Sequence, residues 1–354
     1  MKTVMSSMER VLTAMANQEP DRVPQLLLFS LYGARELEMS VKDYFMDVDL
    51  VVNTQLMLQK KYHNDCLYTF TYAAIETEAF GGEVLFVDDE PPNAGAPLIT
   101  SLEGIPSLTL PDLGTSPGLL RILELTRRLK QAAGDSIPII GVVMSPFSLP
   151  IMQLGFEKYL ELIYFRPKLF NQLMALNSVF CVNWANAQLA AGATAICYFN
   201  PLASPTIIEK ATYLKTGYAC DCQTLAKIKG PTATHLASGI VLPVLDEIIN
   251  SKTALLGFGQ GDDAPVLKAR SRNRIALAGN LNGIEMVNWS LEKTRITVKT
   301  LIRQAGVGGG LLISDSHGEI PYQVPSDVLA TIAETVGEWG QYPLEWIGAD
   351  QDAS

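Results

Sequence analysis

Several features that would place a protein in a specialised class are scarce in this sequence. Its five cysteines form no CxxC pair, which argues against a disulfide framework and fits reduced thiols in a cytoplasmic protein. No run approaches the roughly 18 apolar residues of a membrane-spanning helix, and residues 1–20 lack the apolar core of a signal peptide. Lysine and arginine number 27 against 37 aspartates and glutamates, and they do not cluster. We therefore expect neither a membrane nor a nucleic acid as a partner, because a phosphate backbone requires concentrated positive charge.

Histidine is also rare, with 3 in 354 residues, but two of the three follow one repeated pattern. Between residues 190 and 320, a short apolar run stops abruptly at polar residues: at Asn200, at His235, at Asn280 and at residues 314–319. Each run has the length of a strand, and amphipathic helical sequence follows most of them. This rhythm is typical of a parallel α/β barrel whose strands are buried on both faces. Because such barrels carry their active sites at the carboxyl ends of the strands, the pattern predicts an enzyme.

The apolar runs predict eight strands with helices between them, which is the number that a closed (β/α)8 TIM barrel requires. The predicted strands cover residues 23–29, 66–72, 137–144, 194–199, 230–235, 253–258, 273–279 and 310–314. We predict a single domain over residues 1–354, with an N-terminal helical extension over 1–21. A hairpin insertion after the second strand is expected over 81–87, leading into a proline-rich loop at 91–97. Long helices are expected over 119–133 and over 157–191, the latter broken near Arg166 and Pro167.

Three segments together resemble the uroporphyrinogen decarboxylase superfamily, which also contains cobalamin-linked methyltransferases. The first is MERVL at residues 8–12 with EPDRVP at 19–24, similar to the family's opening "ERV…PDRVP". The second is ETEAFGG at 76–82, similar to the family's "E-A-x-G" segment, and the third is LAGNL at 277–281 followed by residues 315–321. The resemblance spans nearly the whole chain. It implies a TIM barrel with its reaction at the barrel mouth.

The resemblance also separates the branches of the superfamily. The decarboxylases act on a ring with several carboxylates and present arginines after the first strand, whereas residues 25–40 here contain only Arg35. The thiol-methylating branch holds zinc with a His-x-Cys and a further Cys, and the matching positions here are His235, Ala237 and His317. Ala237 has no ligand atom. The resemblance therefore favours transfer of a methyl group from a small donor to the cob(I)alamin of a corrinoid protein, as in O-demethylases.

Three alternatives to this reading stay open at this point. A decarboxylase-like lyase acting on a carboxylated ring is the first, and a methylcorrinoid:thiol methyltransferase is the second. The third is a barrel that binds a tetrapyrrole or corrinoid without chemistry.

The predicted catalytic residues follow from the chemistry of a methyl ether. Its leaving group is an alkoxide or phenoxide, so the oxygen must be protonated or bound to a Lewis acid as the bond breaks. His317 is flanked by Asp315 and Glu319, which supplies an imidazole and two carboxylates at one strand end. In one hypothesis, His235 and His317 bind zinc together with a carboxylate. In the other, no metal is present and His317, assisted by Asp315 or Glu319, is the general acid.

An aromatic series favours a methoxylated aromatic as the methyl donor. Tyr68, Phe70 and Tyr72 alternate on or after the second predicted strand, where they either hold a planar substrate or belong to the core. Asn280 is expected to orient the substrate or to cap the following helix. The predicted substrate-binding residues are Tyr72, Phe199, Asn200 and Asn280.

Overall fold

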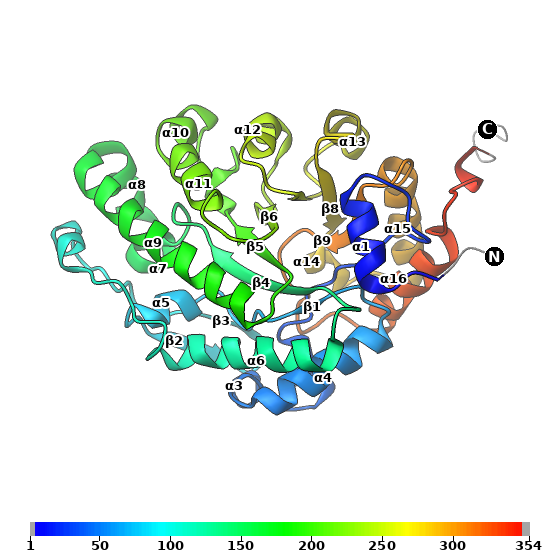
Figure 1. The fold of residues 1–354 in the computed structure, drawn as a ribbon, viewed down its shortest axis with the longest axis horizontal. Helices are drawn as coiled ribbons and strands as arrows, with labels where there is room; N and C mark the ends of the chain where they lie inside the picture. Colours follow the sequence, from blue (N-terminus) through cyan, green and yellow to red (C-terminus); the bar gives the residue numbers. More distant parts are fainter. Residues whose placement is uncertain (1–3, 349–354) are drawn as a thin grey trace.

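The computed structural model describes residues 4–348, and its main element is a sheet of seven parallel strands. They lie in the order β1-β4-β5-β6-β7-β8-β9. Each strand of this sheet therefore lies beside the strand of the sheet that comes next along the chain. The strands are β1 (Leu67–Tyr68), β4 (Ile139–Met144), β5 (Ala195–Phe199), β6 (Thr232–His235), β7 (Leu255–Phe258), β8 (Ala276–Leu281) and β9 (Leu311–Asp315). Figure 1 shows the sheet at the centre with helices arranged around it. The predicted TIM-barrel-like α/β fold is confirmed.

Helices connect the strands and cover the outside of the sheet (Figure 1). The α-helices are α1 (Ser7–Met15), α2 (Tyr32–Glu36), α3 (Val41–Met46), α4 (Val48–Lys61), α5 (Ile75–Ala79), α6 (Pro117–Ala133), α7 (Pro150–Leu154), α8 (Phe156–Phe165), α9 (Pro167–Ala191), α10 (Lys210–Lys215), α11 (Gly217–Leu225), α12 (Leu245–Asn250), α13 (Ala264–Ser271), α14 (Gly283–Met286), α15 (Leu291–Ala305) and α16 (Ser326–Trp339). Short 3₁₀ helices are η1 (Leu102–Ser107), η2 (Pro201–Ala203) and η3 (Leu242–Val244).

The predicted helix break at Arg166 and Pro167 is confirmed. Pro167 is the first residue of α9, where its missing N–H costs no hydrogen bond, and it disfavours helical backbone at the preceding residue. Arg166 accordingly leaves the helical conformation, with φ −128° and ψ 57°. The chain therefore turns between α8 and α9 and does not form one long helix.

The N-terminal extension contains one helix, α1. Ser6 and Glu9 form a capping box at its start, which satisfies backbone N–H groups that the helix leaves free. Its buried face, with Val11 and Ala14, packs in a cluster with Leu255 and Ala276, the first residues of β7 and β8. The extension thus covers the amino ends of the strands, opposite the end where the site is expected.

The prediction of eight regular strands is wrong in one position. Residues 23–29 make a single parallel bridge, from Gln25 to Ile313 of β9, and no regular strand. On the other side, toward β1, side chains replace strand pairing: Asn64 accepts a hydrogen bond from the Leu27 N–H (2.8 Å) and donates one to the Leu27 carbonyl (2.9 Å). Asp65 accepts from the Gln25 N–H (2.9 Å). The segment therefore occupies the eighth position of the ring through backbone hydrogen bonds with Ile313 on one side and mainly through the side chains of Asn64 and Asp65 on the other. A strand pattern does not reveal these side-chain bonds.

We expect Asn64→Ala to lower the free energy of unfolding by roughly 2–4 kcal/mol, because it leaves the buried N–H and C=O of Leu27 without partners. Urea unfolding followed by circular dichroism measures this difference. The exposed Asn53 on α4 is the matched control, since Asn53→Ala removes the same atoms from the surface. Equal stability of the two variants would contradict the assigned role of Asn64.

The region after the first regular strand also differs from the prediction. The strand expected over 66–72 is regular only at Leu67–Tyr68, and the chain then runs irregularly to α5. The predicted hairpin is present as β2 (Val84–Val87) and β3 (Glu90–Ala94), which pair antiparallel. Residues 91–94 of the proline-rich segment expected as a loop thus belong to one arm of the hairpin, and residues 95–97 lie beyond it. Proline is accepted in this arm because β3 pairs with β2 alone and leaves its other edge free of strand partners.

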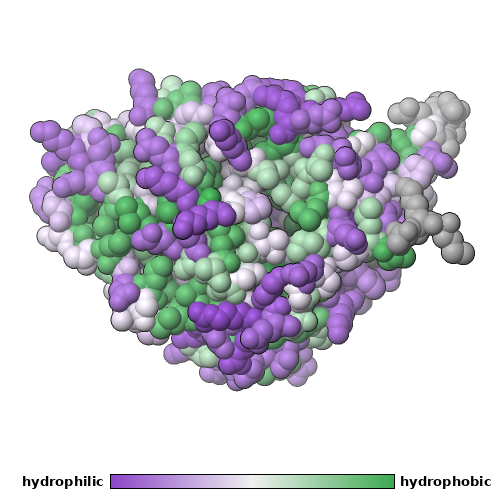
Figure 2. Space-filling model, viewed as in Figure 1, coloured by the Kyte–Doolittle hydropathy of each residue, from purple (hydrophilic) through white to green (hydrophobic). Residues whose placement is uncertain are grey.

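The face of the molecule in Figure 2 mixes hydrophilic and hydrophobic residues. Exposed apolar side chains of the protein include Phe156, Tyr164 and Phe165 of α8, with Phe165 74% exposed. Within residues 4–348, no helix combines the length and the apolar character needed to cross a membrane.

Candidate active site

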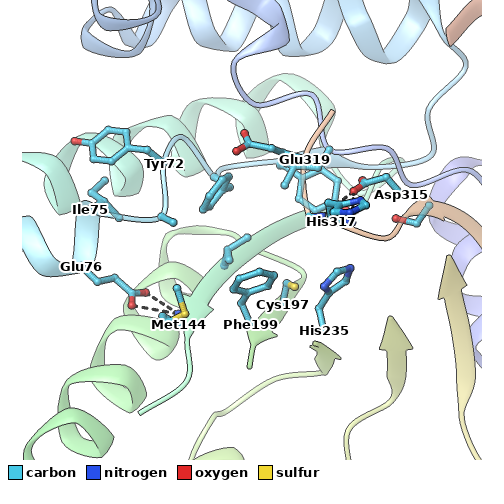
Figure 3. A pocket seen from close by; sticks show the side chains of 17 residues that line it. Tyr72, Ile75, Glu76, Met144, Cys197, Phe199, His235, Asp315, His317 and Glu319 are labelled. Carbon is cyan, nitrogen blue, oxygen red and sulfur yellow. Dashed lines mark hydrogen bonds between the residues drawn. The ribbon is translucent and has the colours of Figure 1, made fainter. Parts of the chain in front are cut away.

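A cavity opens at the carboxyl ends of the strands, and its space including the open mouth is about 820 Å³. Side chains from the last residues of β4, β5, β6 and β9 reach it, together with the loops after β1 and β9 (Figure 3). Its lining is Leu28, Tyr68, Phe70, Tyr72, Ala73, Ile75, Glu76, Val142, Met144, Cys197, Phe199, His235, Ser314, Asp315, His317, Gly318 and Glu319. Most of this lining is apolar or aromatic, so the few polar groups stand out as the candidates for chemistry.

His235 ends β6 and faces the cavity, as the sequence predicts. It is paired in register with Phe199 of β5, and the two rings stack with centroids 5.6 Å apart. Its Nδ1 accepts a hydrogen bond from the Ala237 N–H (3.0 Å), which leaves the proton of the neutral ring on Nε2. Burial lowers the pKa of His235, and the nearby Asp315 opposes this effect. His235 is therefore a neutral imidazole at neutral pH.

His317 lies in the same cavity, on the loop that follows β9. Asp315 shapes this loop, because its Oδ1 accepts hydrogen bonds from the N–H groups of His317 (3.0 Å) and Gly318 (2.7 Å). Gly318 has φ +113°, a backbone conformation that glycine adopts more readily than residues with a Cβ atom. The His317 Nδ1 lies 3.3 Å from the Ser316 hydroxyl. The structure thus brings the two histidines together, but the bonds of Asp315 go to the backbone and not to an imidazole.

Glu319 also reaches the cavity, two residues beyond His317 (Figure 3). Its carboxyl accepts a hydrogen bond from the hydroxyl of Ser30, which lies on the loop before α2. Burial raises the pKa of Glu319 to about 7; the Ser30 hydrogen bond lowers it, and the charge of Asp315 raises it further. A carboxyl group with such a pKa holds a proton that it can release at neutral pH, which is what a general acid requires.

Glu76 is a pocket residue that was not among the predicted catalytic or substrate-binding residues. It lies in α5, is 3% exposed, and its two carboxyl oxygens accept from the Met144 N–H at 3.0 and 3.2 Å. Burial raises the pKa of Glu76 to about 8. Its position in the family-like segment at 76–82 was a signal, but only the fold shows that the side chain faces the cavity.

Aromatic rings form much of the cavity wall. Tyr68, Phe70, Tyr72 and Phe199 all line it, so the predicted aromatic series does face the same space. The Tyr72 hydroxyl donates to Glu78 (2.7 Å) and points away from the other labelled residues in Figure 3. Tyr72 thus offers the cavity its ring and not its hydroxyl. Tyr68 and Phe70 belong to the wall as well.

Two predicted substrate-binding residues lie outside this cavity. Asn200 is 1% exposed, and its side chain is held by Ser145, Ser148 and Asp221. Asn280 lines a separate hollow beside α13 and α15. It does not cap the following helix either, because the cap of α14 is Asn282. The strand-end pattern marks both asparagines, but it does not tell which side of the strand each side chain takes.

No lysine or arginine belongs to the lining of this cavity. Arg35, the one arginine that follows the first predicted strand, donates instead to the carbonyls of Tyr322 (2.9 Å) and Val324. Its guanidinium therefore fastens the loop before α16 to α2. A ring with several carboxylates would find three carboxyl groups here and no cation, which is unfavourable.

The residues present do not fit a zinc site of three protein ligands. In the part of the chain that the structure describes, no three His, Cys, Asp or Glu side chains are arranged to hold a metal ion. Ala237, at the position that the resemblance assigns to a ligand, donates its N–H to His235. Cys197 does line the cavity, but burial raises the pKa of its thiol to about 12. Thiolate, the form of cysteine that binds zinc, is thus disfavoured.

Comparison with known proteins assigns the family. The model of the family described as uroporphyrinogen decarboxylase (URO-D) matches residues 6–339. The uroporphyrinogen decarboxylases of Tolumonas auensis and Nitrosomonas europaea are each 24% identical, with the first alignment covering 90% of this chain and 94% of that protein, and the second covering 80% and 81%. Among solved structures, a methyltransferase from Methanosarcina mazei is similar with a TM-score of 0.83 at 18% identity, covering 94% of this chain and 99% of that one. The chain therefore belongs to the uroporphyrinogen decarboxylase family of enzymes.

Proposed function

We propose that this protein transfers a methyl group from a methoxylated aromatic donor to the cob(I)alamin of a corrinoid protein. The reduced corrinoid supplies the nucleophile that takes the methyl group, and the chain supplies the donor site and the acid. The donor ring lies among Tyr68, Phe70 and Phe199, with its ether oxygen toward Glu319. As the methyl–oxygen bond breaks, the oxygen keeps the electron pair and takes the proton of Glu319, so the product is a phenol.

The observation that carries this proposal is the carboxyl of Glu319 in a largely aromatic cavity whose lining holds no lysine or arginine. Glu319 has a pKa of about 7, so it can protonate a phenoxide leaving group at neutral pH. The similar fold of the Methanosarcina mazei methyltransferase also supports transfer chemistry in this barrel. The general acid we propose is thus Glu319, with His317 beside it, a change from the expectation that His317 itself is the acid.

The relatives named uroporphyrinogen decarboxylase raise decarboxylation as the competing function. The cavity argues against it, because the substrate's carboxylates would meet Glu76, Asp315 and Glu319 without a lysine or arginine among the lining residues. The two functions differ in their products, so one set of assays separates them.

The decisive experiment mixes the protein with a reduced corrinoid carrier and one donor at a time. Conversion of cob(I)alamin to methylcob(III)alamin is followed by its absorption spectrum, with methoxyaromatics, methylamines and methanol as donors. We expect conversion with a methoxyaromatic. No conversion with any donor, or release of carbon dioxide from uroporphyrinogen, would overturn the proposal. Methyl transfer only from methylcorrinoid to a thiol would favour the thiol branch.

The pH dependence of the transfer step follows from the same residue. Glu319 has its pKa raised to about 7, so its acidic proton is present below that pH and is lost above it. We expect the single-turnover rate constant to be level below pH 7 and to fall about tenfold per pH unit above it. Stopped-flow measurement with pre-reduced corrinoid checks this. A rate that rises with pH would contradict the acid role, and Glu319→Gln should remove the fall near pH 7.

A further inference from the structure

Glu76 forms a second polar position in the cavity, away from Glu319 and His317. Figure 3 shows its carboxyl on the opposite side of the cavity from Asp315 and His317, next to Met144. The side chain is 3% exposed, and α5 fixes it in place. The proposed transfer step does not use this carboxyl, although it is one of the most deeply buried polar groups of the lining.

The hydrogen bonding of Glu76 is incomplete in the protein. Among the residues that the structure describes, the carboxyl has one partner, the Met144 N–H, which is itself a donor. With the pKa of Glu76 raised to about 8 by burial, the group carries an O–H at neutral pH. Within residues 4–348, the one group hydrogen-bonded to this carboxyl is a donor, and a buried O–H without an acceptor costs about 1–3 kcal/mol. The cavity is the direction from which an acceptor can come.

We propose that Glu76 binds a hydroxyl substituent of the methyl donor and so selects hydroxylated methoxyaromatics over methoxybenzene. A hydroxyl group accepts the O–H of Glu76, and its own proton can return to a carboxyl oxygen. A carboxylate substituent is excluded, because the lining holds three carboxyl groups and neither lysine nor arginine. Glu76 is thus a specificity residue that touches the substrate. This inference rests on the proposed function, since it names the donor class.

Calorimetric binding without any corrinoid tests the inference separately from turnover. The probes are methoxybenzene and the three methoxyphenol isomers. We expect at least one isomer to bind the wild-type protein about tenfold more tightly than methoxybenzene. Glu76→Leu should abolish this preference, whereas Glu76→Gln should keep most of it, because the amide N–H donates in place of the O–H. A wild-type protein that binds no methoxyphenol better than methoxybenzene would overturn the inference.

Infrared difference spectroscopy keeps the test decisive where Glu76→Leu fails to fold. Binding of the preferred methoxyphenol should shift the C=O band of a protonated carboxyl in the wild type and in Glu78→Gln. Glu78 lies on the same helix but is bound to Tyr72 outside the lining. Because Glu319 can also carry a proton near the ligand, the decisive comparison is made in a Glu319→Gln background. There the shift should be lost when Glu76→Gln is added, and its persistence would refute a contact with Glu76. Selective binding without methyl transfer would leave this contact intact and contradict only the proposed function.

Discussion

Glu319→Gln is expected to slow methyl transfer to cob(I)alamin by about 10²–10⁴-fold, the range that a positioned general acid contributes. Glutamine keeps the size of the side chain and its contact with Ser30, but it has no proton to give to a phenoxide. Single-turnover absorption spectroscopy measures the rate constant of this step. Because the ring-binding wall is untouched, the affinity for the donor should change less than threefold.

The matched control is Glu78→Gln, since Glu78 lies near the site but outside its lining. It should leave the rate constant within about twofold. If Glu319→Gln were equally harmless while His317→Ala removed activity, the acid would be the imidazole, as the sequence pattern alone suggests. Full activity in both Glu319→Gln and His317→Ala would show that neither side chain protonates the leaving oxygen.

Asp65→Ala is expected to lower the free energy of unfolding by about 3–5 kcal/mol, the usual cost of removing one partner of a buried ion pair. Asp65 is 1% exposed and accepts from Arg10 (2.6 Å), Arg22 (2.8 Å) and the Gln25 N–H (2.9 Å). Its loss removes one carboxylate partner from the buried Arg10 and the only ion pair of the half-buried Arg22 given by these contacts. Chemical denaturation followed by circular dichroism gives the difference.

An exposed ion pair provides the comparison for Asp65. Asp49 pairs with Arg128 at the surface, where its side chain is 76% exposed. Asp49→Ala should change the free energy of unfolding by less than about 1 kcal/mol, because water screens and solvates both charges. Similar losses in the two variants would show that the Asp65 cluster is not a principal support of the barrel.

The Asp65 cluster also explains part of the family resemblance. The segment at 8–12 supplies Arg10, and the segment at 19–24 supplies Asp21 and Arg22, which meet around Asp65. These residues tie the N-terminal extension to the chain between α4 and β1. The two N-terminal motifs that help to identify the family are therefore structural, whereas the segments at 76–82 and 315–321 supply residues that line the cavity.

The strands in the second half of the chain were predictable because burial on both faces makes them continuous apolar runs. The run ending at His235 forms β6, which pairs with β5 on one side and β7 on the other. The run ending at Asp315 forms β9, which pairs with β8. The segment at 23–29 has the same apolar composition but is held by Asn64 and Asp65, which lie about 40 residues away. Periodicity reports burial, but it does not report which groups satisfy the backbone.

The sequence by itself determined the alternation of strands and helices, the family, and the meeting of His235 and His317 at one end of the barrel. These follow from apolar patterning and from parallel connections, which bring all carboxyl ends of the strands to one side. Only the tertiary structure decided that Glu76 and Glu319 are acids of one cavity, that Asp315 bonds the backbone, and that Asn200 and Asn280 lie elsewhere. The reason is physical: the pKa and the direction of a side chain depend on neighbours that are distant in sequence, and folding alone brings them together.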